Sequence, residues 1–87
     1  MKMIIAIVKD DDVENIINAL TTNQYRFTRV ASTGGFFKKG STTLLSGIED
    51  NQVDALIDLL KKNSTADQSG KRGLTIFVMP VDRFEQV

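Results

Sequence analysis

Residues 3–20 read MIIAIVKDDDVENIINAL, and this stretch sets the pattern for the whole chain. It opens with six apolar residues, most of them β-branched, which predicts a strand from Met3 to Val8. After the aspartates, apolar residues fall at i, i+3, i+4 and i+7, the spacing of one helix face. These residues are Val13, Ile16, Ile17 and Leu20. The stretch therefore predicts a strand that leads directly into an amphipathic helix, which ends near residues 21–23.

Three consecutive aspartates, residues 10–12, separate this strand from this helix. Asp11 and Glu14 have the spacing of a capping box, and carboxylates stabilise the N-terminus of a helix. A divalent-metal site is the alternative. Three consecutive carboxylates do not converge on one ion without further ligands, so the sequence favours the helix start over the metal site.

The helix pattern occurs a second time, forty residues further along the chain. The repeated apolar positions are Val53, Leu56, Ile57 and Leu60. Three more strands are predicted at residues 25–32, 42–48 and 74–79, the last of them stopped by Pro80. The order β-α-β-β-α-β is the ferredoxin-like α+β sandwich, in which both helices pack on one face of the sheet.

The second face of this sheet is also expected to be apolar. In the first strand, Met3, Ile5 and Ile7 point away from the face formed by Ile4, Ala6 and Val8. In the last strand, Phe77 and Met79 likewise oppose Ile76 and Val78. Because two helices cover only one side, the simplest cover for the other side is another copy of the chain. We therefore expect a homo-oligomer whose sheets face inward.

Length and composition exclude several classes of protein. The 87 residues, 41% hydrophobic and 25% charged, suit one globular domain over residues 1–87. A net charge of zero gives no overall field that would hold a nucleic-acid polymer or an anionic membrane. With no cysteine or histidine, disulfides, Cys/His zinc sites and imidazole bases are excluded. No general base paired with a nucleophile is visible, so we expect a protein that is not an enzyme.

The remaining segments are short. The apolar run from Met3 to Val8 is far below the length that spans a bilayer, and no signal-peptide pattern surrounds it, so we expect a cytoplasmic protein. Residues 61–73 are polar and aperiodic, which predicts a mobile surface loop. The tail 81–87 contains Phe84 as a candidate anchor.

The densest group of unusual residues lies between Arg26 and Thr43. The spacing Gly35-x-x-x-x-Gly40 is similar to a Walker A loop, but Ser41 stands where that loop needs lysine, and a strand follows instead of a helix. Two interpretations stay open. The aromatic rings and glycine amides of the loop bind a nucleotide while Arg26 contacts its phosphate, or the segment is an ordinary hairpin loop. RNA binding is disfavoured because the first and third strands contain no aromatic residue.

Several blocks of sequence resemble one family. They are Thr33-Gly34-Gly35-Phe36, Gly40-x-Thr42-Thr43 with Gly47, and Thr75-Ile76-Phe77-Val78-Met79-Pro80-Val81-Asp82-x-Phe84. Together with the opening residues 1–8, they resemble the PII-like cyclic-di-AMP receptors of Gram-positive bacteria. The resemblance implies a ferredoxin-like homotrimer that binds cyclic di-AMP between subunits, regulates a further protein of unknown identity, and uses no cofactor.

The resemblance also assigns roles by position. Arg26 would contact phosphate, an adenine would lie among Thr28, Gly35, Phe36 and Gly47, and Phe77 and Gln86 would close the pocket. Two features depart from the family. Ser41 occupies a position that is usually asparagine, whose amide both donates and accepts hydrogen bonds. The segment between the second helix and the last strand is also much shorter than in the family.

Overall fold

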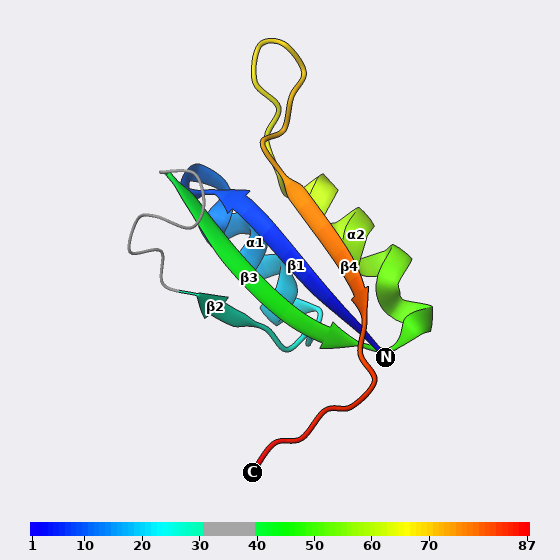
Figure 1. Cartoon of the computed structure of the whole chain (residues 1–87). Helices are drawn as coiled ribbons and strands as arrows, with labels where there is room; N and C mark the ends of the chain where they lie inside the picture. Colours follow the sequence, from blue (N-terminus) through cyan, green and yellow to red (C-terminus); the bar gives the residue numbers. More distant parts are fainter. Residues whose placement is uncertain (31–39) are drawn as a thin grey trace.

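The computed structural model describes residues 1–30 and 40–87. Its elements are β1 (Lys2–Lys9), the 3₁₀ turn η1 (Asp10–Asp12), α1 (Val13–Thr22), β2 (Thr28–Val30), β3 (Ser41–Ile48), the 3₁₀ turn η2 (Asp50–Gln52), α2 (Val53–Lys62) and β4 (Thr75–Pro80). The strands form one antiparallel sheet in the order β2-β3-β1-β4, with both helices behind it in Figure 1. The predicted α+β architecture, with its ferredoxin-like order of elements, is confirmed.

The core lies between the sheet and the two helices. Alternate residues of β1 and β3 point into it, and the apolar helix faces predicted from the i, i+3, i+4, i+7 spacing cover them. The buried apolar side chains are Ile4, Ala6, Val8, Val13, Ile16, Leu20, Leu44, Ile48, Leu56 and Leu60. Full burial of one large side chain of this kind contributes about 1.5–3 kcal/mol. These residues therefore account for the packing of both helices on the same face.

The other face of the sheet carries the second apolar set. Met3, Ile5 and Ile7 of β1 are half-buried there, opposite the buried residues of the same strand. On the neighbouring β4, Phe77 and Met79 are 49% and 47% exposed. No helix of the described residues covers this face (Figure 1). The predicted two-sided apolar sheet is confirmed.

The forty-residue repeat extends beyond the helices. Each helix follows a 3₁₀ turn, and each is followed by an asparagine. The side-chain amide of Asn23 donates to the carbonyl of Ala19 at 2.8 Å, and that of Asn63 donates to the carbonyl of Leu59 at 2.8 Å. Both helices therefore end with the same asparagine, whose backbone amide and side-chain amide donate to one carbonyl of the last turn.

The predicted capping box of Asp11 and Glu14 is wrong. No side chain caps the N-terminus of α1, because residues 10–12 form a 3₁₀ turn of their own. Asp12 is instead only 1% exposed. Its carboxylate accepts hydrogen bonds from the Thr65 backbone amide at 3.1 Å and the Thr65 hydroxyl at 2.8 Å. Asp12 therefore joins the start of α1 to the connection between α2 and β4.

The second strand is shorter than predicted. Within the described residues it spans only Thr28–Val30, whereas the sequence favoured residues 25–32. The chain leaves α1 through Gln24, whose φ of 64° is left-handed, and the amide of Tyr25 still donates to the carbonyl of Leu20. Phe27 then packs against the core. Residues 24–27 thus finish the helix and contact the core before ladder pairing begins at Thr28.

The polar loop begins at residue 63 and not at the predicted residue 61, because α2 continues to Lys62; it projects beyond the end of the sheet (Figure 1). Its surface position is confirmed, and its tip has a hydrogen-bonded turn that the sequence analysis did not predict. One carboxylate oxygen of Asp67 accepts from the amide and hydroxyl of Ser69 and from the amide of Lys71. These bonds lower the pKa of Asp67, with the Ser69 hydroxyl as the largest cause. At the base, the ammonium of Lys9 donates to the carbonyl of Thr65 at 3.0 Å.

Helices long and apolar enough to cross a membrane do not occur among residues 1–30 and 40–87.

Candidate functional site

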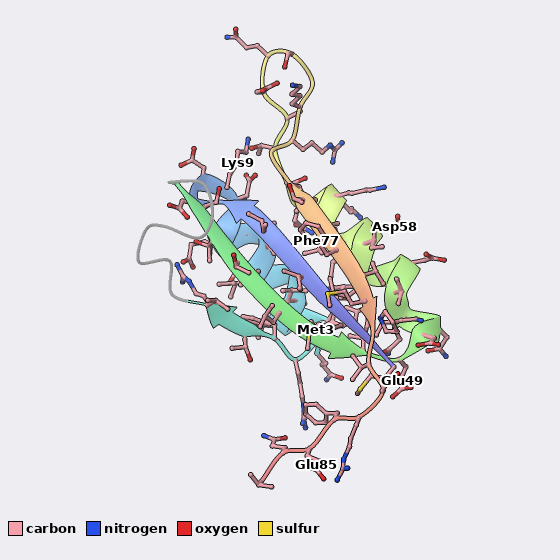
Figure 2. The ribbon with its side chains drawn as sticks, in the orientation of Figure 1. Met3, Lys9, Glu49, Asp58, Phe77 and Glu85 are labelled. Carbon is pink, nitrogen blue, oxygen red and sulfur yellow. The ribbon has the colours of Figure 1, made fainter. Side chains whose placement is uncertain are left out.

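A pocket of about 500 Å³ lies at the end of the sheet where β1 begins and β3 ends. This size is within the usual range of small-molecule sites. Figure 2 shows Met3 and Glu85 at this end and Lys9 at the other end of β1. The wall comes from β1, β3, the segment before β2, and the C-terminal tail: Met1, Met3, Arg26, Phe27, Thr28, Leu45, Ser46, Gly47, Phe84, Glu85 and Gln86. Apolar side chains form much of the wall, and a few polar groups interrupt it.

Arg26 is the basic side chain of this wall. It is exposed, and its guanidinium makes no hydrogen bond or ion pair with any described residue. Thr28, two residues further along, begins β2 opposite Leu45. A free guanidinium beside a hydroxyl presents several donors, which is the arrangement that recognises a phosphate.

The backbone of Arg26 is held by a residue that the sequence analysis missed. The hydroxyl of Ser46 donates to the Arg26 carbonyl at 2.6 Å, and Ser46 is only 7% exposed. The one signal in the sequence is the place of Ser46 in the repeat. It follows Ala6 by forty residues, so a polar residue occupies a position that is apolar in the first half.

Gly47 and the tail complete the pocket. A methyl group added at Gly47 would meet only the Met1 side chain, at 4.0 Å, so the missing side chain leaves space in the pocket. Gln86 and Phe84 reach the same space from the tail. Phe84 is 62% exposed and lies outside the core, so its predicted role as an anchor is wrong. The start of the tail is held instead by a hydrogen bond from the Val81 amide to the Met1 carbonyl.

Two acidic groups near the pocket are neutralised by cations. Glu85 lines the pocket, and its carboxylate is paired with the guanidinium of Arg83. Asp50 lies 3.0 Å from the terminal ammonium of Met1. The hydrogen bond from this ammonium is the main reason that the pKa of Asp50 is lowered. Among residues 1–30 and 40–87, the Arg26 guanidinium is therefore the unpaired cation that this wall presents to an anionic ligand.

The structure gathers four of the predicted site residues, Arg26, Thr28, Gly47 and Gln86. Ser41 lies at the opposite end of β3, paired with Lys9, whereas Gly47 pairs with Met3. At about 3.3 Å per residue, these two ends of β3 are about 20 Å apart. Phe77 pairs with Ile5 midway along β4, an edge strand of the sheet. Gly35 and Phe36 lie outside the described residues.

Two of the three aspartates considered for a metal site have other partners. Asp10 accepts a hydrogen bond from the Thr42 hydroxyl at 2.7 Å, and Asp12 binds Thr65. No group of three or more metal-ligating side chains that could hold an ion occurs in the described part of the chain.

A comparison of the sequence with known protein families gives a match over most of the chain. A model described as "Cyclic-di-AMP receptor" matches residues 1–72, which include β1 to α2 and the Arg26 side of the pocket. The chain belongs to the cyclic-di-AMP receptor family. The matched range ends before β4, so Phe77 and Gln86 fall outside it.

The similarity to individual proteins extends over nearly the whole chain. The "Nitrogen fixation nifHD region GlnB-like protein 1" of Methanothermococcus thermolithotrophicus is 33% identical over 94 residues, covering 93% of this chain and 88% of that protein. The crystal structure of a functionally unknown protein from Pediococcus pentosaceus ATCC 25745 is 33% identical, with a TM-score of 0.81 over 99% of this chain and 96% of that chain. The GlnB-like relative supports the PII-like family assignment of this chain, which is confirmed.

Proposed function

We propose that this receptor is a PII-like signal-transduction protein that binds cyclic di-AMP, or a related nucleotide, at the interfaces between its subunits. The observation that carries the proposal is the pocket that gathers Arg26, Thr28, Gly47 and Gln86 in a chain of this family. Receptors and signalling proteins of this kind are generally non-catalytic, and we propose the same for this chain.

The chemistry of the pocket suits the two parts of a cyclic dinucleotide. The phosphodiester is anionic, and the Arg26 guanidinium is free to form charge-assisted hydrogen bonds with it. The adenine rings are flat and largely apolar on their faces, which suits contact with Phe84 and the methionines of the wall. Gln86 has both a donor and an acceptor for the edge of the base.

The distribution of the other predicted residues supports a site between subunits. Ser41 and Phe77 do not reach the pocket of their own chain, because they lie elsewhere on the sheet. The face that carries Phe77 is apolar and has no cover among the described residues. A neighbouring subunit on this face would bury it and bring its own Ser41 or Phe77 toward the ligand. We propose a homotrimer, as implied by the resemblance to PII-like receptors.

Calorimetric titration with cyclic di-AMP tests the proposal. Arg26→Ala should weaken binding by about 1.5–3 kcal/mol, the scale of a hydrogen bond to a charged group, while assembly is unchanged. Arg26→Lys should recover only part of the affinity, since an ammonium does not reproduce the planar fork. Arg29→Ala is the matched control, because Arg29 is an exposed arginine three residues further along, in β2, and does not line the pocket. Absence of heat with the native chain at high micromolar ligand would reject cyclic di-AMP.

Ser41→Asn tests whether a neighbour's β3 contributes to the site. If Ser41 faces an adenine across an interface, restoring the amide should tighten binding of cyclic di-AMP. Unchanged affinity for both Ser41→Asn and Arg26→Ala would mean that the proposed pocket is wrong.

Assembly has its own test, independent of the ligand. Sedimentation velocity should give three times the chain mass of 9.7 kDa. A charge on the open face, as in Phe77→Asp, should yield monomers. A native chain that is monomeric at low micromolar concentration would contradict the proposed trimer.

A second candidate is an oligomeric interaction module of the same fold that binds no nucleotide. The projecting loop with its hydrogen-bonded turn at Asp67 favours it, because an ordered protruding loop is suited to contact a partner protein. An intact trimer that gives no heat with cyclic di-AMP would favour this candidate. Nucleotide binding that survives shortening of residues 64–72 would favour the receptor function.

A further inference from the structure

Ser46 is polar, whereas the equivalent residue in the first half of the repeat is apolar. Its counterpart forty residues earlier is Ala6, which is buried in the core, and the flanking pairs Ile4 and Leu44, and Val8 and Ile48, are apolar in both halves. A buried hydroxyl lowers stability unless it is hydrogen-bonded. The partner of the Ser46 hydroxyl is the Arg26 carbonyl, at 2.6 Å.

The segment that Ser46 contacts has few other attachments. Ladder pairing between β2 and β3 starts at Thr28, so Arg26 lies outside it. On the other side, the chain leaves α1 at Gln24 with a left-handed φ, and the Tyr25 amide is the last to bond back to the helix. Between Tyr25 and Thr28, the Ser46 hydroxyl and the packing of Phe27 hold the backbone.

The same serine adjoins both the core and the pocket. It lines the pocket next to Arg26 and Gly47, and it also borders a void of about 10 Å³ in the core, beside Ala6 and Phe27. The Ser46 hydroxyl therefore links the end of β3 to the backbone that carries the Arg26 guanidinium. Side chains that must meet a ligand bind best when their own backbone is already held in place.

We propose that Ser46 is a positioning residue for nucleotide binding: its hydroxyl holds the Arg26 backbone at the rim of the pocket and so raises the affinity of Arg26 for the phosphate. This inference rests on the proposed function for its effect on affinity. The positioning itself is a property of the free protein and is measured separately below.

The affinity test uses single and double substitutions and calorimetry with cyclic di-AMP. Ser46→Ala should weaken binding roughly threefold to tenfold, the range of one neutral hydrogen bond. Ser46→Thr should restore most of this loss, since it keeps the hydroxyl and the adjoining void has room for about one water-sized group. In an Arg26→Ala background, Ser46→Ala should not weaken binding further, because the guanidinium through which Ser46 acts is absent.

Ser64→Ala is the matched control. Its hydroxyl also donates to a backbone carbonyl, that of Lys61 at 2.8 Å, but it lies in the loop after α2 and does not line the pocket. It should leave the affinity unchanged. The proposal would be overturned if Ser46→Ala lowered the affinity equally in the native and Arg26→Ala backgrounds, or if it did not lower the affinity at all.

A measurement without ligand separates this inference from the proposed function. Backbone ¹⁵N relaxation of the free protein should show lower heteronuclear NOE values for residues 25–27 in Ser46→Ala, and native values in Ser46→Thr. If the native chain does not bind cyclic di-AMP, the proposed function fails, while this result still decides whether Ser46 positions Arg26. Native NOE values in Ser46→Ala would overturn the positioning role.

Discussion

The two halves of the chain, residues 2–23 and 42–63, have the same framework and different polar contacts. Each half contains a strand, a 3₁₀ turn, a ten-residue helix and a terminal asparagine cap. Buried apolar residues recur at equivalent positions in both: Ile4 and Leu44, Val8 and Ile48, Ile16 and Leu56, Leu20 and Leu60. The core is therefore built twice from one pattern.

The differences between the halves occur where a polar residue contacts a connecting segment. Ser46 replaces the equivalent Ala6 and binds the backbone before β2. Asp12 is buried and binds Thr65, whereas the equivalent Gln52 is exposed. The repeated residues therefore build the core, while the residues that depart from the repeat bind the segments that connect its parts.

Truncating equivalent core residues should have the largest effect. Ile16→Ala and Leu56→Ala should each lower the free energy of unfolding by about 2–5 kcal/mol, because both side chains are fully buried. Urea unfolding at a fixed protomer concentration measures this, since assembly makes stability concentration-dependent. The exposed equivalents Asn18→Ala and Asp58→Ala are controls, with changes within about 0.5 kcal/mol. If only one of the two core substitutions lowered the free energy of unfolding by less than about 1 kcal/mol, the two halves would not contribute equally to the core.

Removing the buried carboxylate should have the next largest effect, and in one half only. Asp12→Ala should cost about 1.5–3 kcal/mol, because it leaves two donors of Thr65 without their charged acceptor. Gln52→Ala, at the equivalent exposed position, should cost less than about 0.5 kcal/mol. In a double-mutant cycle with Thr65→Val, the two losses should not add. Similar costs at Asp12 and Gln52 would show that the Thr65 contact contributes nothing to stability.

The asparagine caps should have smaller, equal effects. Asn23→Ala and Asn63→Ala each remove one side-chain bond of 2.8 Å to a helix carbonyl, so each should cost about 0.5–1.5 kcal/mol. Thermal unfolding of the two variants under identical conditions compares them. A clear inequality would mean that the neighbouring loops, which differ, contribute to one of the caps.

Acid should loosen the turn at Asp67, which has no counterpart in the first half. Its hydrogen bonds lower the pKa of Asp67, so they contribute stability above the usual carboxyl range that is lost as pH falls through the lowered pKa. The amide resonances of Ser69 and Lys71 should move together only at acidic pH, below the usual titration range of aspartate. In Asp67→Asn they should not move. Titration at the ordinary pKa would contradict the hydrogen-bonded turn.

The interpretation of single residues from sequence was weaker than that of whole elements. Gly47 and Gln86 were assigned only through the family resemblance, and no periodicity places them beside Arg26 and Thr28. These four residues come together because the segment between α1 and β2, the end of β3 and the tail meet at one corner of the sheet. Ser46 was missed because a serine in a strand has no pattern that reveals its partner.

The amino-acid sequence alone determined the two helices, the β-α-β-β-α-β order, the forty-residue repeat and the apolar second face of the sheet. These features follow from local geometry, because the periods of helices and strands decide which side chains share a face. Only the tertiary structure decided that Asp12 binds Thr65, that Ser46 holds Arg26, and that Ser41 lies far from the pocket. Hydrogen bonds are short and directional, so their partners depend on where distant segments of the chain meet.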